Sequence, residues 1–185
     1  MCIRDSIYFE GQDIWADKFP LRGLRSQVGL VFQYPEHQLF ESDVLSDVCY
    51  GPMNQGKSRE EAEEEARKAL LQVGFKEKNF DKSPFDLSGG QKKRVAIAGV
   101  LATKPELLML DEPLAGLDPM AREMFLEFLE GLAGQGVSVV MVSHNVDALA
   151  QHAARIIGMK QGKIVMDGSC QEVLGDSRAL RTIGL

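Results

Sequence analysis

Two adjacent acids at the end of an apolar run are the residues best suited to chemistry in this 185-residue chain. Asp111 and Glu112 follow Leu107–Leu110, four apolar residues that predict a strand buried on both faces of a parallel sheet. Open α/β sheets bind ligands at the carboxyl ends of their strands, and successive strand residues point to opposite sides. One acid can therefore hold Mg²⁺ through water, while the other orients and deprotonates an attacking water.

A glycine turn that opens a helix precedes these acids. Ser88–Gln91 reads SGGQ, and because glycine has no Cβ, a ligand can approach the backbone closely there. The free N–H groups of the following helix N-terminus attract an anion, and the basic run Lys92–Arg94 adds positive charge in the first turns. The segment Thr103–Pro105 predicts the end of this helix, since proline cannot continue it.

Two other apolar runs end in polar residues. Val28–Phe32 precedes Gln33, and Val137–Val142 precedes Ser143 and then His144. Both runs predict buried strands. A glutamine or a histidine at a strand end is, by itself, more often a surface or structural residue. The functional interpretation of Gln33 and His144 therefore depends on their place in a larger, ordered set of motifs.

That ordered set resembles the ATP-binding cassette (ABC) ATPases. Leu87–Gln91 (LSGGQ) resembles their signature motif, Leu107–Pro113 (LLMLDEP) their Walker B motif with its following glutamate, and Ala115–Asp118 (AGLD) their D-loop. The resemblance covers nearly the whole chain, and its motifs are specific because they occur together in this order. It implies that Gln33 is the Q-loop glutamine and His144 the H-loop histidine.

The resemblance implies a role in ATP hydrolysis for each of these residues, with ATP and Mg²⁺ as cofactors. Asp111 and Gln33 would serve the Mg²⁺, and Gln33 would also reach the attacking water. Glu112 would be the general base, and His144 would contact the γ-phosphate. Other residues would act between two ATPase subunits, binding the nucleotide of the opposite subunit or linking the two active sites: Ser88, Gly89, Gly90, Gln91 and Asp118.

Two further segments narrow the resemblance. Tyr34–Phe40 (YPEHQLF) and Tyr50–Asn54 (YGPMN) resemble the ATPase subunits of energy-coupling factor (ECF) transporters, which import vitamins and transition metals. The combination is most similar to the second ATPase of the vitamin-type modules. This implies a head-to-tail dimer with the related first ATPase, a homodimer remaining open, and two membrane partners, a transmembrane coupling subunit and a substrate-binding subunit. The expected location is the cytoplasmic face of the cell membrane.

One segment matches the phosphate-binding P-loop pattern G-x-x-x-x-G-K-[ST], but we interpret it as the start of a surface helix. Gly51–Ser58 follows Val44–Cys49, whose apolar residues recur with helical spacing, whereas a P-loop follows a buried strand. Pro52 has no backbone N–H to offer a phosphate. Ser58 and Glu61 predict a capping box, and the five glutamates of this region would repel a polyphosphate.

The fold class expected from these motifs is α/β, with a P-loop NTPase-like parallel core sheet and a small antiparallel region. A helical subdomain is expected to be inserted at about residues 39–86. The first strands and the P-loop of the family have no counterpart before Ile7, so residues 1–185 are expected to form one N-terminally truncated ABC ATPase domain. Met1–Ser6 resembles an appended leader. We expect the chain alone to be inactive.

Helical spacing also predicts an amphipathic helix after the D-loop motif. The segment Ala121–Gly134 is expected to be this helix. Near the start of the chain, Ile7–Gln12 is expected to be a strand that leaves into a turn. A hairpin is expected around Gln161–Gly162, with short closing helices over Gly168–Leu185. The residues expected to point inward from the amphipathic helix are Met124, Phe125, Phe128, Leu129 and Leu132.

Composition limits the classes of function. The chain is 44% hydrophobic and 26% charged, and its net charge of −6 argues against a nucleic-acid partner. Three scattered cysteines indicate reduced thiols in a cytosolic protein. No apolar run reaches the ~20 residues needed to span a bilayer.

Two alternatives remain open at this point. One is a soluble ABC ATPase that acts on DNA or ribosomes, although only 54 residues without heptads separate Gln33 from Ser88, where DNA-repair members carry long coiled coils. The other is a catalytically inactive fragment or regulatory subunit, for which the absent Walker A motif is the evidence.

Overall fold

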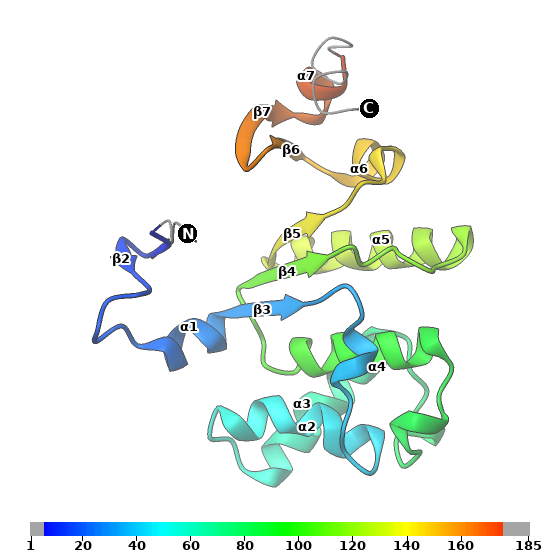
Figure 1. Ribbon diagram of the computed structural model, residues 1–185. Helices are drawn as coiled ribbons and strands as arrows, with labels where there is room; N and C mark the ends of the chain where they lie inside the picture. The colour runs from blue at the N-terminus through cyan, green and yellow to red at the C-terminus, as the bar shows by residue number, and fades with distance from the viewer. Residues whose placement is uncertain (1–5, 176–185) are drawn as a thin grey trace. The chain divides into compact units, whose positions relative to one another are not determined.

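The structure, a computed structural model, describes residues 6–175, apart from the side chains of Asp147, Ala148 and Leu174 (Figure 1). The expectations for residues 1–5 and 176–185 therefore lie outside the described residues. The chain divides into two compact units. The first contains Met1–Ala115 and Leu132–Val142, and the second contains Gly116–Gly131 and Ser143–Leu185.

A three-stranded parallel sheet forms the centre of the first unit, in the order β3-β4-β5 (Figure 1). Its strands are β3 (Val28–Val31), β4 (Leu107–Asp111) and β5 (Ser138–Val142). In the register, Leu30 lies opposite Met109, and Met109 lies opposite Val140. The predicted parallel α/β core is thereby confirmed. The carboxyl ends of all three strands meet at one edge of the sheet, which we call the carboxyl edge.

Helix α4 (Gly89–Leu101) covers one face of this sheet. A Cβ on Gly29 of β3 would lie 2.5 Å from Val100 of α4, so strand and helix approach closely there. Leu108 and Leu110 are buried on this face. On the opposite face the described residues leave Met109 36% and Val140 44% exposed. The prediction that these strands are buried on both faces is therefore wrong for Met109 and Val140, whose side chains lie on the face that α4 does not cover.

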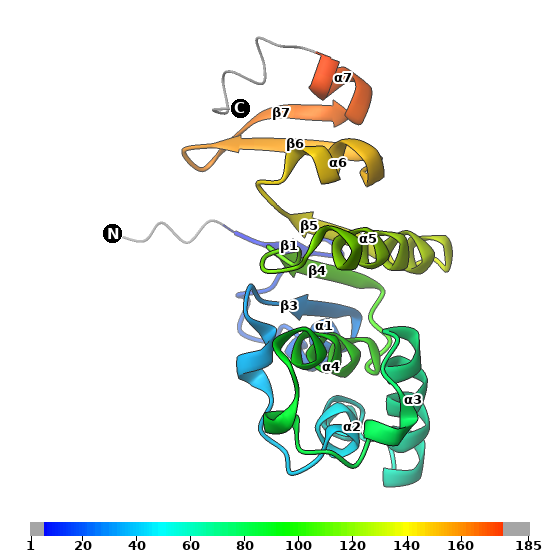
Figure 2. The ribbon, with the colours of Figure 1, turned by 90° about the vertical axis from the view of Figure 1, so that its right-hand side faces the viewer.

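Two helices between β3 and α4 pack together and against α4 (Figure 2). They are α2 (Val44–Asn54) and α3 (Arg59–Gln72), and short turns η1 (Pro35–Gln38), η2 (Glu77–Asn79) and η3 (Pro84–Asp86) complete the region. Asp43 caps α2 by accepting a hydrogen bond from the Ser46 N–H. Gly74, with φ of 70°, ends α3, and Phe75 N–H donates back to Leu70. The core residues of these helices are Val44, Val48, Ala62, Ala66, Ala69 and Leu70.

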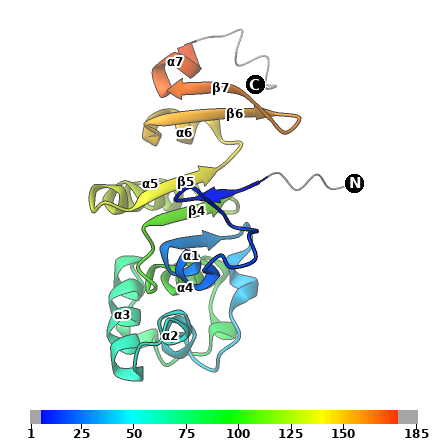
Figure 3. The same ribbon diagram turned by 90° about the vertical axis from the view of Figure 1, so that its left-hand side faces the viewer.

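The N-terminal segment forms a short hairpin (Figure 3). Strands β1 (Tyr8–Phe9) and β2 (Gln12–Asp13) pair antiparallel, and helix α1 (Leu21–Gln27) leads into β3. Glu10 and Gly11 have φ of 48° and 76°, the left-handed values of a two-residue hairpin turn. The expected strand that leaves into a turn is therefore confirmed for Tyr8–Gly11.

The second unit contains most of helix α5 (Pro119–Gly134) and a second hairpin. Helix α6 (Val146–His152) precedes strands β6 (Arg155–Lys160) and β7 (Lys163–Ser169), and α7 (Cys170–Gly175) follows. The turn Gln161–Gly162 has φ of 51° and 75°, which confirms the predicted hairpin. In the described part of the chain, no helix is both long enough and apolar enough to cross a bilayer.

Candidate functional site

The SGGQ turn begins helix α4 through a capping box. Ser88 is the N-cap, and its hydroxyl accepts a hydrogen bond from the Gln91 N–H at 3.4 Å. The Gln91 side chain accepts in return from the Ser88 N–H at 3.0 Å. These two side chains therefore satisfy backbone groups of their own turn and fix the start of the helix.

Packing within the described chain does not require glycine at the two glycine positions of the turn. A Cβ built on Gly89 or Gly90 would meet no other atom within 4 Å, and both residues are exposed. Gly29 and Gly51 differ, because a Cβ there would lie 2.5 Å and 2.7 Å from neighbouring side chains. The absence of a Cβ at these two positions leaves the backbone at the start of α4 open to close approach.

The basic run after the turn is only partly available to an anion. Lys93 is 8% exposed, and its Nζ donates to the Ala115 carbonyl at 3.1 Å. Burial lowers the pKa of the Lys93 ammonium, and the Glu36 carboxylate opposes that shift. Lys93 therefore places its charge on the inner face of α4 and not at the exposed turn.

The paired acids stand at the carboxyl edge, as expected. Asp111 is the last residue of β4 and lies opposite Val142 of β5. Glu112 follows with φ of 44°, a left-handed value that is unusual for a residue other than glycine, and its N–H donates to the Val142 carbonyl at 2.9 Å. Strained backbone of this kind concentrates at functional sites, where the surrounding structure holds it.

Gln33 reaches the same edge from the neighbouring strand. Val31, the last residue of β3, lies opposite Leu110, so the chain that leaves β3 through Phe32 and Gln33 does so next to the end of β4, where Asp111 and Glu112 follow Leu110. Gln33 is exposed, and η1 begins two residues later. A carboxylate and an amide oxygen at one sheet edge are ligands of the kind that Mg²⁺ prefers. The structure thus brings together the strand ends that carry Gln33, Asp111 and Glu112.

The two remaining predicted residues belong to the second unit. His144 is exposed and follows β5 after Ser143, whose hydroxyl accepts a hydrogen bond from the Asn145 N–H at 3.1 Å. Asp118 caps helix α5, since its Oδ1 accepts from the Ala121 N–H at 2.9 Å. His144 therefore lies between the end of β5 and the start of α6, and Asp118 lies at the start of α5.

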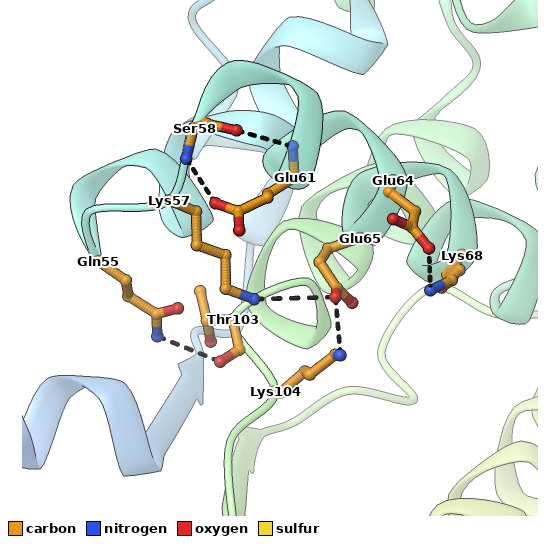
Figure 4. Close-up of polar contacts among 9 residues, drawn as sticks. All are labelled: Gln55, Lys57, Ser58, Glu61, Glu64, Glu65, Lys68, Thr103 and Lys104. Carbon is orange, nitrogen blue, oxygen red and sulfur yellow. Dashed lines mark hydrogen bonds and ion pairs between the residues drawn. The ribbon is translucent and has the colours of Figure 1, made fainter.

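The segment that matches the P-loop pattern has internal partners (Figure 4). Gly51 lies inside α2, where a Cβ would lie 2.7 Å from Thr103. Lys57 Nζ lies 3.9 Å from Glu65, which also pairs with Lys104 at 2.7 Å. Ser58 caps α3 in the predicted capping box with Glu61, which is confirmed.

These contacts explain the pattern without a phosphate. The glycine permits two helices to approach, the lysine pairs with a carboxylate, and the serine begins a helix. Glu64 and Lys68, one helical turn apart on α3, also form an ion pair at 2.7 Å. The segment therefore has the surface-helix structure that its sequence indicates.

Comparisons with known proteins extend these observations. The family model described as ABC transporter matches residues 1–115. The energy-coupling factor transporter ATP-binding protein EcfA2 of Caldanaerobacter subterraneus subsp. tengcongensis is 46% identical over 183 residues, which are 98% of this chain and 64% of that protein. EcfA2 of Clostridium perfringens is 48% identical over 182 residues, 97% of this chain and 64% of that protein. The chain thus spans less than two thirds of these relatives.

Solved structures show the same fold. CbiO1 of Clostridium perfringens, described as part of the ABC transporter complex cbiONQ, is 34% identical with a TM-score of 0.81, and the match covers 95% of this chain and 70% of CbiO1. The ATP-binding cassette MJ0796, solved as a dimer bound to ADP and Pi, is 27% identical with a TM-score of 0.77, covering 89% of this chain and 73% of MJ0796. With its ordered motifs, its parallel core and these matches, the chain belongs to the ABC transporter family.

Proposed function

We propose that this chain is part of an ATP-binding and ATP-hydrolysing subunit that powers an ECF-type importer of vitamins or transition metal ions. One observation carries the proposal furthest. The exposed SGGQ turn keeps two glycines that nothing in the described chain requires, at the start of a helix of 13 residues. A phosphate of a bound nucleotide fits this turn, because free N–H groups and the positive end of the helix dipole face it.

The carboxyl edge of the sheet supplies the proposed chemistry. Asp111 and Gln33 would hold Mg²⁺, which when bound neutralises charge on the phosphates. Glu112 would accept a proton from the attacking water as general base, and His144 would contact the γ-phosphate. Phosphoryl transfer needs mainly positioning and charge stabilisation, so the backbone that fixes Glu112 is part of this proposal.

A second ATPase subunit is proposed as the partner of the turn. Ser88, Gly89, Gly90 and Gln91 would bind the nucleotide held by the facing subunit, and Asp118 would link the two active sites. The dimeric state of MJ0796 supports this arrangement. The names of the EcfA2 relatives support a heterodimer with a related ATPase, since the numeral distinguishes one ATP-binding protein from another.

Membrane partners complete the proposed assembly. The helical subdomain at about residues 39–86 is proposed to contact a transmembrane coupling subunit, which in turn joins a substrate-binding membrane subunit. Two exposed aromatic rings of this region, Phe40 and Tyr50, meet edge to face with centroids 4.9 Å apart. Aromatic side chains of this kind are enriched at protein interfaces. The subunit would then lie at the cytoplasmic face of the membrane.

Two rival functions receive less support. Between Gln33 and Ser88 the helices α2 and α3 have 11 and 14 residues, which is far from the long coiled coil of a DNA-repair ATPase. A regulatory subunit without catalysis would not require the strained backbone at Glu112.

The test exploits two serines in matched positions. Ser88 and Ser58 are both exposed N-caps in capping boxes. Because aspartate is as good an N-cap as serine, Ser88→Asp and Ser58→Asp should both leave the helices intact. Only Ser88→Asp would place a negative charge beside the proposed phosphate.

The measurement is ATP hydrolysis and ATP-driven substrate uptake by the complete importer, reconstituted in proteoliposomes with the full-length protein. We expect Ser88→Asp to lower both rates by about tenfold or more, through like-charge repulsion, and Ser58→Asp to leave both near the wild-type values. If the two variants behave alike, the SGGQ turn is not a nucleotide site.

A further inference from the structure

Lys93 is a buried charge that the proposed chemistry does not use. It is one of three buried polar or charged side chains among the described residues, with Asp47 and Asn79. Burying an ammonium is costly, and an apolar side chain of similar volume would fill the space without that cost. The contacts of Lys93 therefore need an explanation.

The first contact leads to the proposed general base. Lys93 Nζ donates to the Ala115 carbonyl at 3.1 Å, in the segment that follows β4. The Ala115 N–H in turn donates to the Glu112 carbonyl at 3.2 Å. Lys93 thus holds the far side of the tight turn that contains Glu112, whose own φ of 44° requires support from its surroundings.

The second interaction of Lys93 is electrostatic, and it involves Glu36 in the segment after β3. Turn η1, which packs against α4, carries Glu36 three residues after Gln33. Glu36 Oε2 is fully buried and has no hydrogen-bond partner among the described residues. Its charge acts on Lys93 and favours the charged ammonium. Positive charge stabilises a buried carboxylate oxygen that has no hydrogen bond, and Lys93, on the helix against which η1 packs, contributes such charge.

We propose that Lys93 is a positioning residue that couples the Gln33–Gln38 segment to the Glu112–Ala115 turn. The proposal rests on the proposed function of Gln33 and Glu112. Both segments follow neighbouring strands at the carboxyl edge, and the Lys93 ammonium donates to the Ala115 carbonyl in one segment and interacts electrostatically with Glu36 in the other. A movement of η1 would therefore change the support of the turn that carries Glu112.

The first experiment measures structure rather than activity. Amide hydrogen exchange is compared for the full-length wild-type protein, Lys93→Met and Glu36→Gln. Lys93→Met removes the donor at similar volume, so we expect faster exchange in residues 34–38 and in residues 112–118, with α3 unchanged as the internal control. Glu36→Gln should also speed exchange in residues 112–118, which Glu36 does not contact through any hydrogen bond.

Amide hydrogen exchange also gives the result that would overturn the proposed coupling. If Glu36→Gln leaves residues 112–118 as in the wild type, or Lys93→Met changes neither segment, Lys93 does not couple them. This outcome is independent of ATP hydrolysis, so it is distinguishable from a failure of the proposed function, in which the wild-type assembly itself does not hydrolyse ATP.

The second experiment separates positioning from stability in the assembled ATPase. We expect Lys93→Met to lower kcat by about tenfold while KM for ATP stays within about twofold, because the loss affects the transition state and not nucleotide binding. Lys93→Arg, which keeps a donor, should recover most of kcat, and Lys68→Met on the exposed face of α3 should match the wild type. A wild-type kcat in Lys93→Met contradicts the proposal. So does a decrease in kcat that is proportional to the decrease in melting temperature across all the variants, because it would reflect lost stability alone.

Discussion

Glu112 combines the proposed general base with a backbone conformation that few residues adopt. Its φ of 44° lies in the left-handed region, and its N–H is held by the Val142 carbonyl. A glutamate is a costly choice at this position for stability alone, since glycine adopts the same conformation without a Cβ penalty. This cost is consistent with the proposed role of its carboxylate as the general base.

This strain predicts an order of stabilities. Glu112→Gly should be more stable than Glu112→Ala by about 1 kcal/mol, because only glycine relieves the left-handed conformation. Denaturant unfolding of the two full-length variants measures the difference. Equal stability, or a more stable alanine variant, would show that the backbone at Glu112 is not strained.

Burial of Lys93 predicts a dependence of stability on pH. Since burial lowers the pKa of Lys93 in the folded protein, the unfolded protein binds more protons between that lowered value and the ordinary lysine value of ~10.4. The free energy of unfolding of the wild type should therefore rise relative to that of Lys93→Met as the pH increases through this window. Urea unfolding at a series of alkaline pH values tests this, and a constant difference between the two proteins refutes it.

The role of Lys93 was not predicted, although the sequence contained a signal for it. Lys93 lies three and four positions before Ala96 and Ile97, which are buried, so helical spacing places it on the inner face of α4. A formal charge suggested exposure instead. Its partners, Ala115 and Glu36, lie 22 and 57 positions away, and no local pattern relates them.

At the scale of elements, caps and turns were the most predictable features. Ser58 with Glu61 predicts the start of α3, and Gly74 predicts its end, because each rule depends on a few neighbouring residues. Side-chain burial along α5 was less predictable. Met124 is 63% exposed and Leu126 is buried, the reverse of the expected stripe, although Leu129 and Leu132 are buried as expected. Helical spacing gives the period of the apolar residues, but α5 has two overlapping apolar stripes, and spacing does not decide which of them is buried.

The α2–α3 connection supports a prediction about Lys57. Because its ammonium lies near Glu65 and the adjoining Ser58 caps α3, Lys57→Ala should leave the ATP affinity of the full-length protein within about twofold, under ~0.5 kcal/mol. Equilibrium titration with Mg²⁺–ATP measures this. A tenfold loss of affinity would mean that Gly51–Ser58 binds phosphate after all.

At the scale of the whole molecule, the parallel sheet and its order of motifs could be predicted, whereas the individual side chains exposed on its faces could be named only from the structure. Apolar runs indicate strands, but which faces are covered depends on how distant helices pack. Leu30, Met109 and Val140 form an exposed apolar row across the sheet in the described residues. Apolar surface of this kind promotes association.

This surface, together with the helical structure of Gly51–Ser58, predicts how the 185-residue chain behaves when purified alone. It should show no micromolar binding of Mg²⁺–ATP in calorimetry, because no described segment offers the converging N–H groups and lysine of a phosphate cradle. It should also scatter light at rising concentration, and Val140→Thr should reduce that scattering. Micromolar binding with steady turnover would contradict this prediction.

The most direct test of the proposed function separates nucleotide binding from hydrolysis in the assembled ATPase. Glu112→Gln keeps the size of the side chain but removes the proposed base, and Glu106→Gln, an exposed residue that precedes the same strand, is the matched control. The measurement is single-turnover hydrolysis of bound Mg²⁺–ATP by the full-length heterodimer. We predict that Glu112→Gln binds ATP like the wild type but hydrolyses it ~10²–10⁴-fold more slowly at the site that Glu112 lines, while Glu106→Gln is unaffected. Undiminished turnover in Glu112→Gln would contradict the assignment of Glu112 as the general base.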